Sequence, residues 1–227
     1  MNVIKFYYHP APNPLKVALF LEESGLPYEV VAVDTYKGEQ FSPSYLLINP
    51  NGKTPAIVDG DVTVFDSNAI LLYLADKTGL FLPHTTLSGR GSLYSWLMFV
   101  ATGVGPFSGQ AAHFLRMASE RIPYAINRYT YEAERHWSVL DARLAKTRYV
   151  LGDTYTIVDM AVWGWARAIP LVLDEAATRK LSNVKRLYDE ISARPAAIRA
   201  EALKAKYAFK AELDEEARRH LFRHTGG

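Results

Sequence analysis

The sequence contains no cysteine among its 227 residues. A chain without cysteine cannot form a disulfide-stapled secreted fold, a Cys-x-x-Cys redox pair or a zinc site with thiolate ligands. It also has no thiolate nucleophile of its own. Any thiol chemistry that this protein carries out therefore needs a sulfur that arrives with a ligand.

Neither a strong net charge nor a long apolar run is present. The 26 Lys and Arg nearly balance the 24 Asp and Glu, giving +2, so there is no strong field for nucleic acid or an anionic membrane. Apolar stretches such as Trp96–Ala101 are far shorter than the ~20 residues of a membrane helix. The first ten residues lack the features of a secretory signal. We therefore expect a cytoplasmic protein with no nucleic-acid or membrane partner.

Arginine is absent from residues 1–82, where five Lys face nine acidic residues, a net charge of −4. The remaining 145 residues hold all fifteen Arg and carry +6. The change falls at a segment of Pro and small polar residues that starts at Pro83. The sequence therefore predicts two domains, residues 1–83 and 90–227, with a boundary near 83–90.

The first part alternates strand-like and helical runs. β-Branched and aromatic residues predict strands at 2–8, 28–33, 56–59 and 62–65, the last two joined as a hairpin at Gly60-Asp61. Apolar periodicity and stop glycines predict helices at 14–24 and 67–78, with Ser67 as a candidate cap, and a less regular one at 37–47. This β-α-β-α-β-β-α order predicts an α/β domain with a small mixed sheet. It contains no glycine-rich phosphate loop.

The second part shows only helical periodicity, at 89–117, 123–146, 157–173, 182–193 and an amphipathic tail at 196–222, which predicts an all-α domain. The run Gly103-Val104-Gly105-Pro106 should end or kink the first helix. Its glycines are better explained by close helix packing than by phosphate binding. Most of the aromatic residues spaced along a helix face should belong to the core, and one or two of them are candidates for the floor of a substrate pocket: Trp96, Phe99, Phe107 and Phe114.

Thr54-Pro55 stands directly before a strand, where proline cannot donate to a ladder. One interpretation is a cis Thr54–Pro55 bond, which would turn the backbone N–H and C=O of Thr54 outward, toward an incoming extended peptide. The other is an ordinary trans turn proline. Only the first predicts a peptide-binding site.

Asp66 and Ser67 stand at the entry to the helix predicted at 67–78. A helix start favours negative charge, so this corner can hold an α-amino acid head group, with Asp66 on the ammonium and Ser67 on the carboxylate. The alternative is a helix cap with no ligand. Together with Thr54-Pro55, twelve residues earlier, the corner indicates a peptide-shaped site.

These motifs resemble the glutathione transferase family. The runs Asn51–Asp59, Asp66–Ile70 and Tyr73-Leu74 resemble its thioredoxin-like glutathione-binding half. Thr156–Ala161 resembles the capping box of its all-α half. The chain is most similar to the nu-class bacterial branch, of the disulfide-bond reductase type, in these segments: Pro12-Asn13, Gly105-Pro106, Gly109-Gln110, His113-Phe114 and 123–129.

The resemblance implies a glutathione site in the first domain. Thr54 would pair through its backbone with the cysteinyl part of glutathione, and Asp66 and Ser67 would hold the γ-glutamyl end. Gln40 and Lys53 match positions whose amide and ammonium reach the ligand's carboxylates, although Lys53 also fits a solvated loop lysine. The remaining contact positions are Ala11 and Pro55.

Arg128 matches an arginine that, in nu-class relatives, reaches across a dimer toward the second half of the site. The resemblance therefore implies a homodimer, and the opposite charges of the two domains favour pairing one with the other across it. The alternative for Arg128 is a surface charge on a helix.

The thiol of bound glutathione needs a group that favours its thiolate. Where the nu class has Thr-Pro-Asn, this chain reads Ala11-Pro12-Asn13, without the hydroxyl, and Pro14 removes a further backbone donor. The first candidate is Asn13, with the N–H of Leu15 as another donor. Tyr7 is the second side-chain candidate. A structural role for Tyr7, as a core residue of the strand, fits it better than a role in catalysis.

The resemblance implies an enzyme with glutathione as co-substrate, no metal, and a small disulfide or electrophile as second substrate. Disulfide reduction is compatible with the lack of cysteine, because two glutathione molecules supply both sulfurs. Conjugation of glutathione to an apolar electrophile is the general alternative. A non-catalytic regulatory protein on the same fold is the competing class. Fungal regulators of this kind carry an Asn/Gln-rich arm before the first strand. In this sequence the first strand is expected from about residue 2, without such an arm before it, which favours the enzyme.

Overall fold

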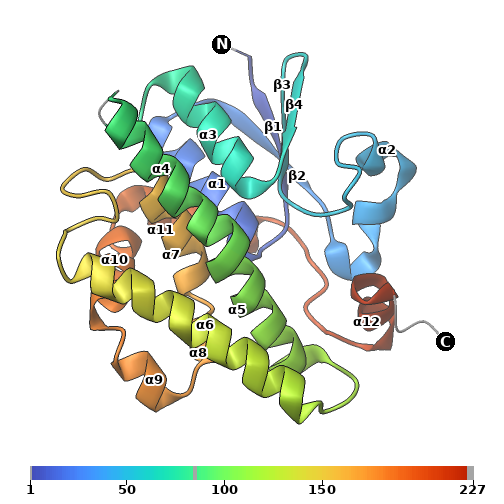
Figure 1. Cartoon of the computed structure of the whole chain (residues 1–227). Coiled ribbons are helices and arrows are strands. Elements are labelled where there is room, and N and C mark those ends of the chain that lie inside the picture. The colour runs from blue at the N-terminus through green and yellow to red at the C-terminus, as the bar shows by residue number, and fades with distance from the viewer. Residues whose placement is uncertain (1, 84–85, 224–227) are drawn as a thin grey trace. The chain divides into compact units, whose positions relative to one another are not determined.

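The computed structural model describes residues 2–83 and 86–223 (Figure 1). The chain divides into two compact units. One contains residues up to Lys77 together with those from Pro195 onward, and the other spans Thr78–Arg194. Each unit is described separately below.

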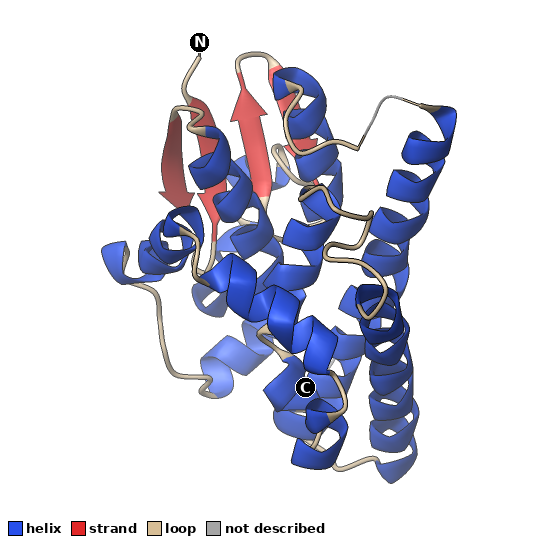
Figure 2. Cartoon of the chain, turned by 90° about the vertical axis from the view of Figure 1, so that its left-hand side faces the viewer, coloured by secondary structure: helices blue, strands red, loops and turns tan. Residues whose placement is uncertain are grey.

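The first unit is built on a four-stranded sheet of order β2-β1-β3-β4, drawn in red in Figure 2. β1 runs parallel to β2 and antiparallel to β3, and β3 is antiparallel to β4. This is the thioredoxin-like α/β arrangement expected from the sequence, and the four predicted strands are confirmed. The elements from its N-terminal part are β1 (Ile4–Tyr8), α1 (Pro12–Ser24), β2 (Tyr28–Ala32), η1 (Thr35–Lys37), η2 (Glu39–Phe41), α2 (Pro43–Leu46), β3 (Ala56–Asp59), β4 (Val62–Phe65) and α3 (Ser67–Thr78).

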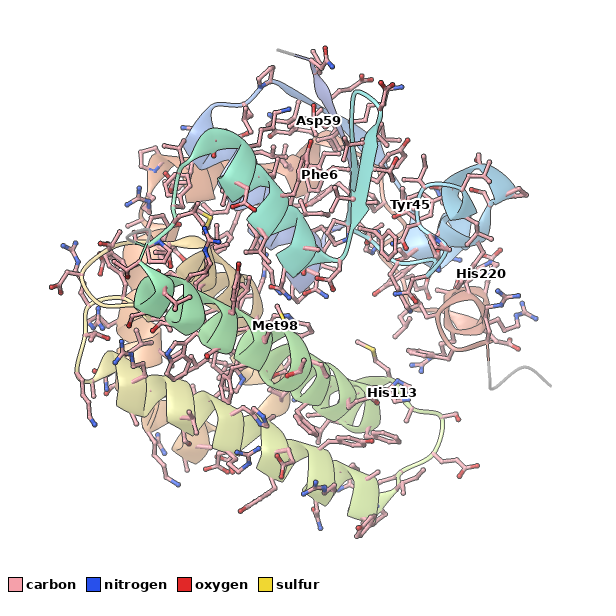
Figure 3. All side chains as sticks on the ribbon, turned by 45° about the horizontal axis from the view of Figure 1, so that its top comes forward. Phe6, Tyr45, Asp59, Met98, His113 and His220 are labelled. Carbon is pink, nitrogen blue, oxygen red and sulfur yellow. The ribbon has the colours of Figure 1, made fainter. Side chains whose placement is uncertain are left out.

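Helix α1 fills the centre of this unit. Every residue from Pro14 to Leu21 is buried, so this helix is surrounded rather than amphipathic. It ends at Gly25, whose φ of 68° allows its N–H to reach the carbonyl of Leu21. The core around it includes the fully buried Phe6 of β1, labelled in Figure 3, and Ile70 and Leu74 of α3.

The helix predicted at 37–47 is not continuous. It is divided into the short turns η1 and η2 and the single-turn helix α2. Gly38 adopts a φ of 78°, which ends η1, and Ser42 is extended before Pro43. The sequence prediction was wrong here because local glycine and proline geometry outweighed the apolar spacing.

The C-terminal tail packs on the first unit, which corrects the predicted extent of the all-helical domain, 90–227. Its helices are α11 (Pro195–Lys206) and α12 (Glu215–Leu221). α11 packs on α1, and Arg199 donates to Glu22 Oε2 at 2.6 Å. α12 packs on η1, where His220 (Figure 3) lies so close to Gly38 that a Cβ there would meet it at 2.5 Å. Contacts to α1 and η1, rather than sequence proximity, therefore decide where the tail belongs.

The second unit is helical, as predicted. Its elements are α4 (Leu87–Phe99), η3 (Val100–Val104), α5 (Gly105–Ala112), η4 (His113–Met117), α6 (Pro123–Leu144), α7 (Ile157–Ala166), α8 (Ile169–Val172), α9 (Glu175–Arg179) and α10 (Ser182–Ser192). The break expected at Gly103–Pro106 takes the form of the π-helical turn η3, in which the N–H of Gly105 donates to Val100. A π turn accommodates Pro106 without ending the helical course. Gly103 and Gly105 are explained by close packing. A Cβ at Gly103 would collide with His136, and a Cβ at Gly105 would collide with Trp165.

The capping box at the start of α7 is confirmed. The N–H of Thr156 donates to Asp159 Oδ2 at 2.8 Å, and Asp159 Oδ1 accepts from the N–H of Val150 at 2.8 Å. Asp159 is fully buried, and this burial raises its pKa to about 6, against the opposing effect of these hydrogen bonds. One carboxylate therefore connects the helix start to the preceding loop.

Candidate functional site

The register of the sheet gathers three of the predicted segments at one end of the first unit. Tyr7, near the end of β1, pairs with Ala56 at the start of β3, and Ala56 pairs with Phe65 at the end of β4. The chain enters α1 just after β1, reaches β3 through Thr54-Pro55, and enters α3 just after β4. The starts of α1 and α3 and the backbone of Thr54 therefore share one edge, as the peptide-site interpretation requires.

The segment before β3 is held from inside the protein. The carbonyl of Lys53 accepts from Tyr45 Oη at 2.7 Å and from Asn49 Nδ2 at 2.6 Å. The Thr54–Pro55 bond is cis, as the first of the two interpretations expects. Pro55 is buried, Thr54 is half-buried and the Lys53 side chain is exposed. The backbone of Thr54 is thus fixed at an accessible edge.

At the start of α3 the capping residue differs from the one expected, which was Ser67. Asp66, not Ser67, caps the helix: its Oδ1 accepts from the N–H groups of Asn68 at 2.9 Å and Ala69 at 3.1 Å. Asp66 is exposed and adopts a φ of 69°, a left-handed conformation that Asp tolerates better than most residues. Ser67 is 3% exposed. The described residues offer no acceptor for the N–H of Ser67, the first backbone donor of the helix.

A residue that the sequence reasoning missed lies behind this corner. Lys16 of α1 is 1% exposed, and its Nζ lies 3.3 Å from Ser67 Oγ and 3.5 Å from Asn68 Oδ1. Its position inside the apolar run 14–21 was the available signal, because a lysine there must share the burial of its neighbours.

The start of α1 is poor in backbone donors. Ala11 is extended (φ −138°, ψ 164°) and provides no side-chain cap, and Pro12 and Pro14 carry no N–H. The N–H of Leu15 donates to the carbonyl of Ala11 at 3.2 Å, so its expected availability to a ligand is not borne out. Asn13, half-buried in the first turn, supplies an amide side chain at the positive end of the helix.

Tyr7 faces the side of the sheet on which α2 lies. Its ring packs on that of Tyr45 at 5.5 Å, and both line a cavity of about 300 Å³ together with residues of β2 and Glu39 and Ser42. Strand alternation puts Tyr7 on the face opposite Phe6 and Tyr8. This packing favours the structural interpretation of Tyr7.

Gln40 is buried, with 2% of its surface exposed. Its Nε2 donates to the carbonyl of Thr35 at 3.2 Å, while its Oε1 has no hydrogen-bond partner among the described residues. Its neighbour Phe41 lies against Gly52, next to Lys53. The structure therefore brings Gln40 close to the edge but inside the protein surface.

Arg128 belongs to α6 of the helical unit. Its guanidinium donates to Glu132 Oε1 at 2.9 Å, and Arg135 donates to Glu132 Oε2 at 2.8 Å. The hydrogen bond from Arg135 is the main cause that lowers the pKa of Glu132. Arg128 is thus held by a neighbour one turn away on the same helix, with a half-exposed side chain.

The aromatic residues proposed for a pocket floor pack on one another, on His136 or on Tyr129. Phe114 stacks on Tyr129 at 5.3 Å, and Phe99 and Phe107 lie 5.1 and 4.9 Å from His136. A cavity of about 300 Å³ in this unit lies elsewhere, against α8 and α10, where Ile169, Pro170 and Tyr188 line it.

Across residues 2–83 and 86–223, no three His, Cys, Asp or Glu side chains stand close enough to hold a metal ion. The helices described for this chain include none that is long and apolar enough to cross a membrane.

Two family models match this chain: the N-terminal domain of glutathione S-transferase at residues 1–76 and its C-terminal domain at residues 123–189. The disulfide-bond oxidoreductase YfcG of Escherichia coli is 41% identical over 226 residues, covering 94% of this chain and 98% of that protein. A glutathione transferase family member from Pseudomonas fluorescens, solved with two glutathione molecules bound, matches with a TM-score of 0.83 at 36% identity. That match covers 88% of this chain and 92% of the other. A glutathione transferase from Pseudomonas putida, solved with one glutathione disulfide per subunit, has a TM-score of 0.82, 31% identity and coverages of 88% and 91%.

Proposed function

Because this chain belongs to the glutathione S-transferase family, we propose that it binds glutathione at the edge formed by α1, Thr54 and α3 and uses its thiol to reduce disulfides. The observation that carries the proposal is the meeting of an accessible, fixed backbone at Thr54 with the start of α3 at Asp66-Ser67. Such an edge fits a short peptide with a free amino acid end.

Each group of the tripeptide has a partner of matching chemistry. The backbone of Thr54 pairs with the cysteinyl residue, and Asp66 meets the α-ammonium with Oδ2, since Oδ1 caps α3. The N–H and hydroxyl of Ser67 meet the α-carboxylate at the positive end of the helix. The exposed ammonium of Lys53 meets the glycyl carboxylate. Pro55 and Ala11 supply contact surface, and the amide of Gln40, buried close to this edge, remains the second candidate for a carboxylate of the ligand.

The thiolate would be stabilised at the start of α1. The side-chain amide of Asn13 is the donor we assign to the sulfur, because Ala11 has no hydroxyl and the N–H of Leu15 is already bonded. The helix dipole adds to this effect. Tyr7 is assigned a structural role, on the basis of its packing against Tyr45.

The reaction needs no protein sulfur. The thiolate of the first glutathione attacks one sulfur of the disulfide substrate, forming a mixed disulfide and releasing the other half as a thiolate. A second glutathione thiolate then attacks the glutathionyl sulfur, which gives glutathione disulfide and releases the remaining thiolate. Two thiols are oxidised and one disulfide is reduced. The relatives solved with two glutathione molecules or with one glutathione disulfide bound support a site that holds two glutathionyl groups.

An activity comparison tests the proposal. The purified protein is assayed with glutathione and 2-hydroxyethyl disulfide, and separately with glutathione and 1-chloro-2,4-dinitrobenzene. Disulfide reduction above the uncatalysed rate, exceeding conjugation, is the expected result. Conjugation alone would assign the chain to the alternative transferase chemistry. Binding of glutathione without either activity would favour a regulatory protein.

A homodimer completes the proposal. The −4 charge of residues 1–82 and the +6 charge of the remainder favour contact between opposite parts of two copies, which would bring Arg128 to the partner's site. Light scattering at the assay concentration should give twice the mass of 25.5 kDa. We place the protein in the cytoplasm, where thiols such as glutathione are kept reduced.

A further inference from the structure

The segment between α11 and α12, residues 207–214, belongs to the first unit and forms neither a helix nor a strand. We call it the C-terminal strap. The ring of Phe209 in this strap lies 5.1 Å from the ring of His9, at an interplanar angle of 83°, and 6.0 Å from the ring of Tyr8. His9 and Tyr8 are 8% and 1% exposed. The strap therefore covers the chain at the point where β1 ends and the turn toward α1 begins.

His9 connects this contact to the start of α1. Its carbonyl accepts from the N–H of Ala11, the N-cap residue of α1, at 2.8 Å. Its ring joins the same turn to η1, because Nδ1 accepts from the N–H of Thr35 at 3.5 Å. This bond requires an unprotonated Nδ1, and burial lowers the pKa of His9, which favours the neutral ring. A displacement of the His9 ring would therefore disturb both the turn before α1 and the start of η1.

A buried carboxylate attaches the strap to η1. The N–H of Lys210 donates to Asp34 Oδ2 at 2.7 Å, and Asp34 Oδ1 accepts from the N–H of Tyr36 at 3.1 Å, which caps η1. Asp34 is 3% exposed, and Lys37 Nζ lies 3.5 Å from its Oδ2. A hydrogen bond to a charged group is stronger than one between neutral groups, so this backbone contact fixes the strap on η1.

Charged side chains join the strap to α12. Lys210 Nζ lies 2.8 Å from a carboxylate oxygen of Asp214, which caps α12, and 2.5 Å from one of Glu216. α12 in turn packs on η1, and the guanidinium of Arg223 lies over the ring of Phe41 at 4.6 Å. The tail therefore holds the η1–η2 loop at both of its ends.

Two groups that the proposed function uses lie next to these contacts. Asn13 follows His9 in the first turn of α1, and Gln40 lies in η2. We propose that Phe209 is a positioning residue of the glutathione site, which acts through His9 to hold the start of α1, and with it Asn13, in the geometry that binds the tripeptide. This inference rests on the proposed function.

The strap has the features of a segment that opens locally. It has no regular secondary structure and Phe209 is only half-buried, so few contacts are lost when it leaves the surface. Opening removes the ring that covers His9 and allows the turn before α1 more conformations. Glutathione must then order this turn at a cost in conformational entropy. The protein with the strap docked therefore binds glutathione more tightly.

The coupling between strap and site acts in both directions. If the docked strap raises the affinity for glutathione by some factor, bound glutathione stabilises the docked strap by the same factor. Couplings between two sites typically amount to about 5- to 150-fold, and a single half-buried ring belongs at the low end of this range. We expect about five- to ten-fold.

Calorimetry with glutathione tests the effect of the strap on the site. Phe209→Ala should raise the dissociation constant about five- to ten-fold, because it removes the ring that covers His9. Phe209→Tyr, which keeps the ring, should bind within about two-fold of the wild type. Glu212→Ala, which changes an exposed residue of the same strap, is the matched control and should bind like the wild type. Circular dichroism at the assay temperature checks that each variant is folded.

The pKa of the bound thiol shows whether the effect passes through the start of α1. Phe209→Ala should raise this pKa, measured from thiolate absorbance, because it disturbs the turn that places Asn13. Phe209→Tyr and Glu212→Ala should leave it unchanged. Direct contact between the strap and glutathione would weaken binding in Phe209→Ala without this shift.

Hydrogen exchange of the wild-type protein tests the reverse effect and needs no variant. Exchange is followed by mass spectrometry with and without saturating glutathione. Peptides that cover residues 207–214 should exchange about five- to ten-fold more slowly with glutathione bound. Exchange in α9, in the other unit, should be unchanged, whereas a general stabilisation would slow both segments. This measurement decides the matter if Phe209→Ala does not fold.

The outcomes separate this inference from the proposed function. A folded Phe209→Ala protein with an unchanged dissociation constant or thiol pKa would overturn the role of Phe209 and leave the glutathione site standing. The same conclusion would follow if glutathione bound to the wild type without slowing exchange in the strap. No binding of glutathione by the wild type would reject the proposed function and the inference with it.

Discussion

Replacement of Asp66 by Asn separates two roles of this residue, the cap of α3 and the negative charge assigned to the ligand's ammonium. Asp66 caps α3 through Oδ1 and adopts a φ of 69°, and its charge is assigned to the ammonium of glutathione. Asn is as good an N-cap as Asp and tolerates the left-handed conformation. Asp66→Asn therefore removes the negative charge and keeps the cap.

The expected magnitudes follow from this division. A hydrogen bond to a charged group is worth about 1.5–3 kcal/mol, and the lower end applies because Asp66 is exposed. Asp66→Asn should therefore raise the dissociation constant of glutathione about ten-fold, with the free energy of unfolding unchanged within about 0.5 kcal/mol. Asp66→Ala should weaken binding similarly. It should also lower the free energy of unfolding by about 2 kcal/mol, because it loses the cap and strains the backbone.

Calorimetry at pH 7 and urea unfolding followed by circular dichroism provide the two readings. Asp61→Asn, which neutralises an exposed carboxylate in the β3–β4 turn, is the matched control and should change neither. Unaltered binding in Asp66→Asn would mean that the ammonium lies elsewhere. Equal stability of Asp66→Asn and Asp66→Ala would refute the capping role.

Three further results are expected. Asn13→Ala should raise the pKa of the bound glutathione thiol by about one unit, which corresponds to a loss of ~1.36 kcal/mol of thiolate stabilisation, whereas Tyr7→Phe should leave this pKa unchanged. The pKa is measured from the absorbance of the thiolate, and the reverse pattern would assign the role to the phenol of Tyr7. Asp159→Ala should lower the free energy of unfolding by about 2–4 kcal/mol in urea, since it removes the capping box and leaves the buried N–H of Val150 without its acceptor. Because burial raises the pKa of Asp159 to about 6, its contribution to stability should fall as the pH rises from about 4 to 6. Thermal unfolding of Asp159→Asn across that range should lack this component, and an identical pH profile in the two proteins would contradict it.

The strands and the long helices could be predicted because their signals are local. Period-two and helical spacing of apolar residues reflect the face that each element buries, and the structure follows them along β1–β4, α3 and α6. The accessible edge was also predictable, because Thr54-Pro55 and Asp66-Ser67 carry their chemistry in short motifs. The pairing of Tyr7, Ala56 and Phe65 then brings these motifs together.

What the sequence could not provide depends on contacts between distant segments. A lysine on a helix is usually solvated, and the burial of Lys16 follows from its place in an entirely enclosed helix. The tail looked like part of the helical domain until its contacts with α1 and η1 were visible. Likewise, the assignment of the α3 cap to Asp66 rather than Ser67 depends on a φ of 69° that residue types alone do not specify.

The most direct measurement is a crystal structure of this protein with glutathione disulfide bound. The account predicts one glutathionyl group with its γ-glutamyl carboxylate at Ser67, its ammonium at Asp66, its cysteinyl backbone paired with Thr54 and its sulfur within hydrogen-bond distance of the Asn13 amide. A disulfide bound away from the edge formed by α1, Thr54 and α3, or bound there with its γ-glutamyl end directed away from α3, would contradict it.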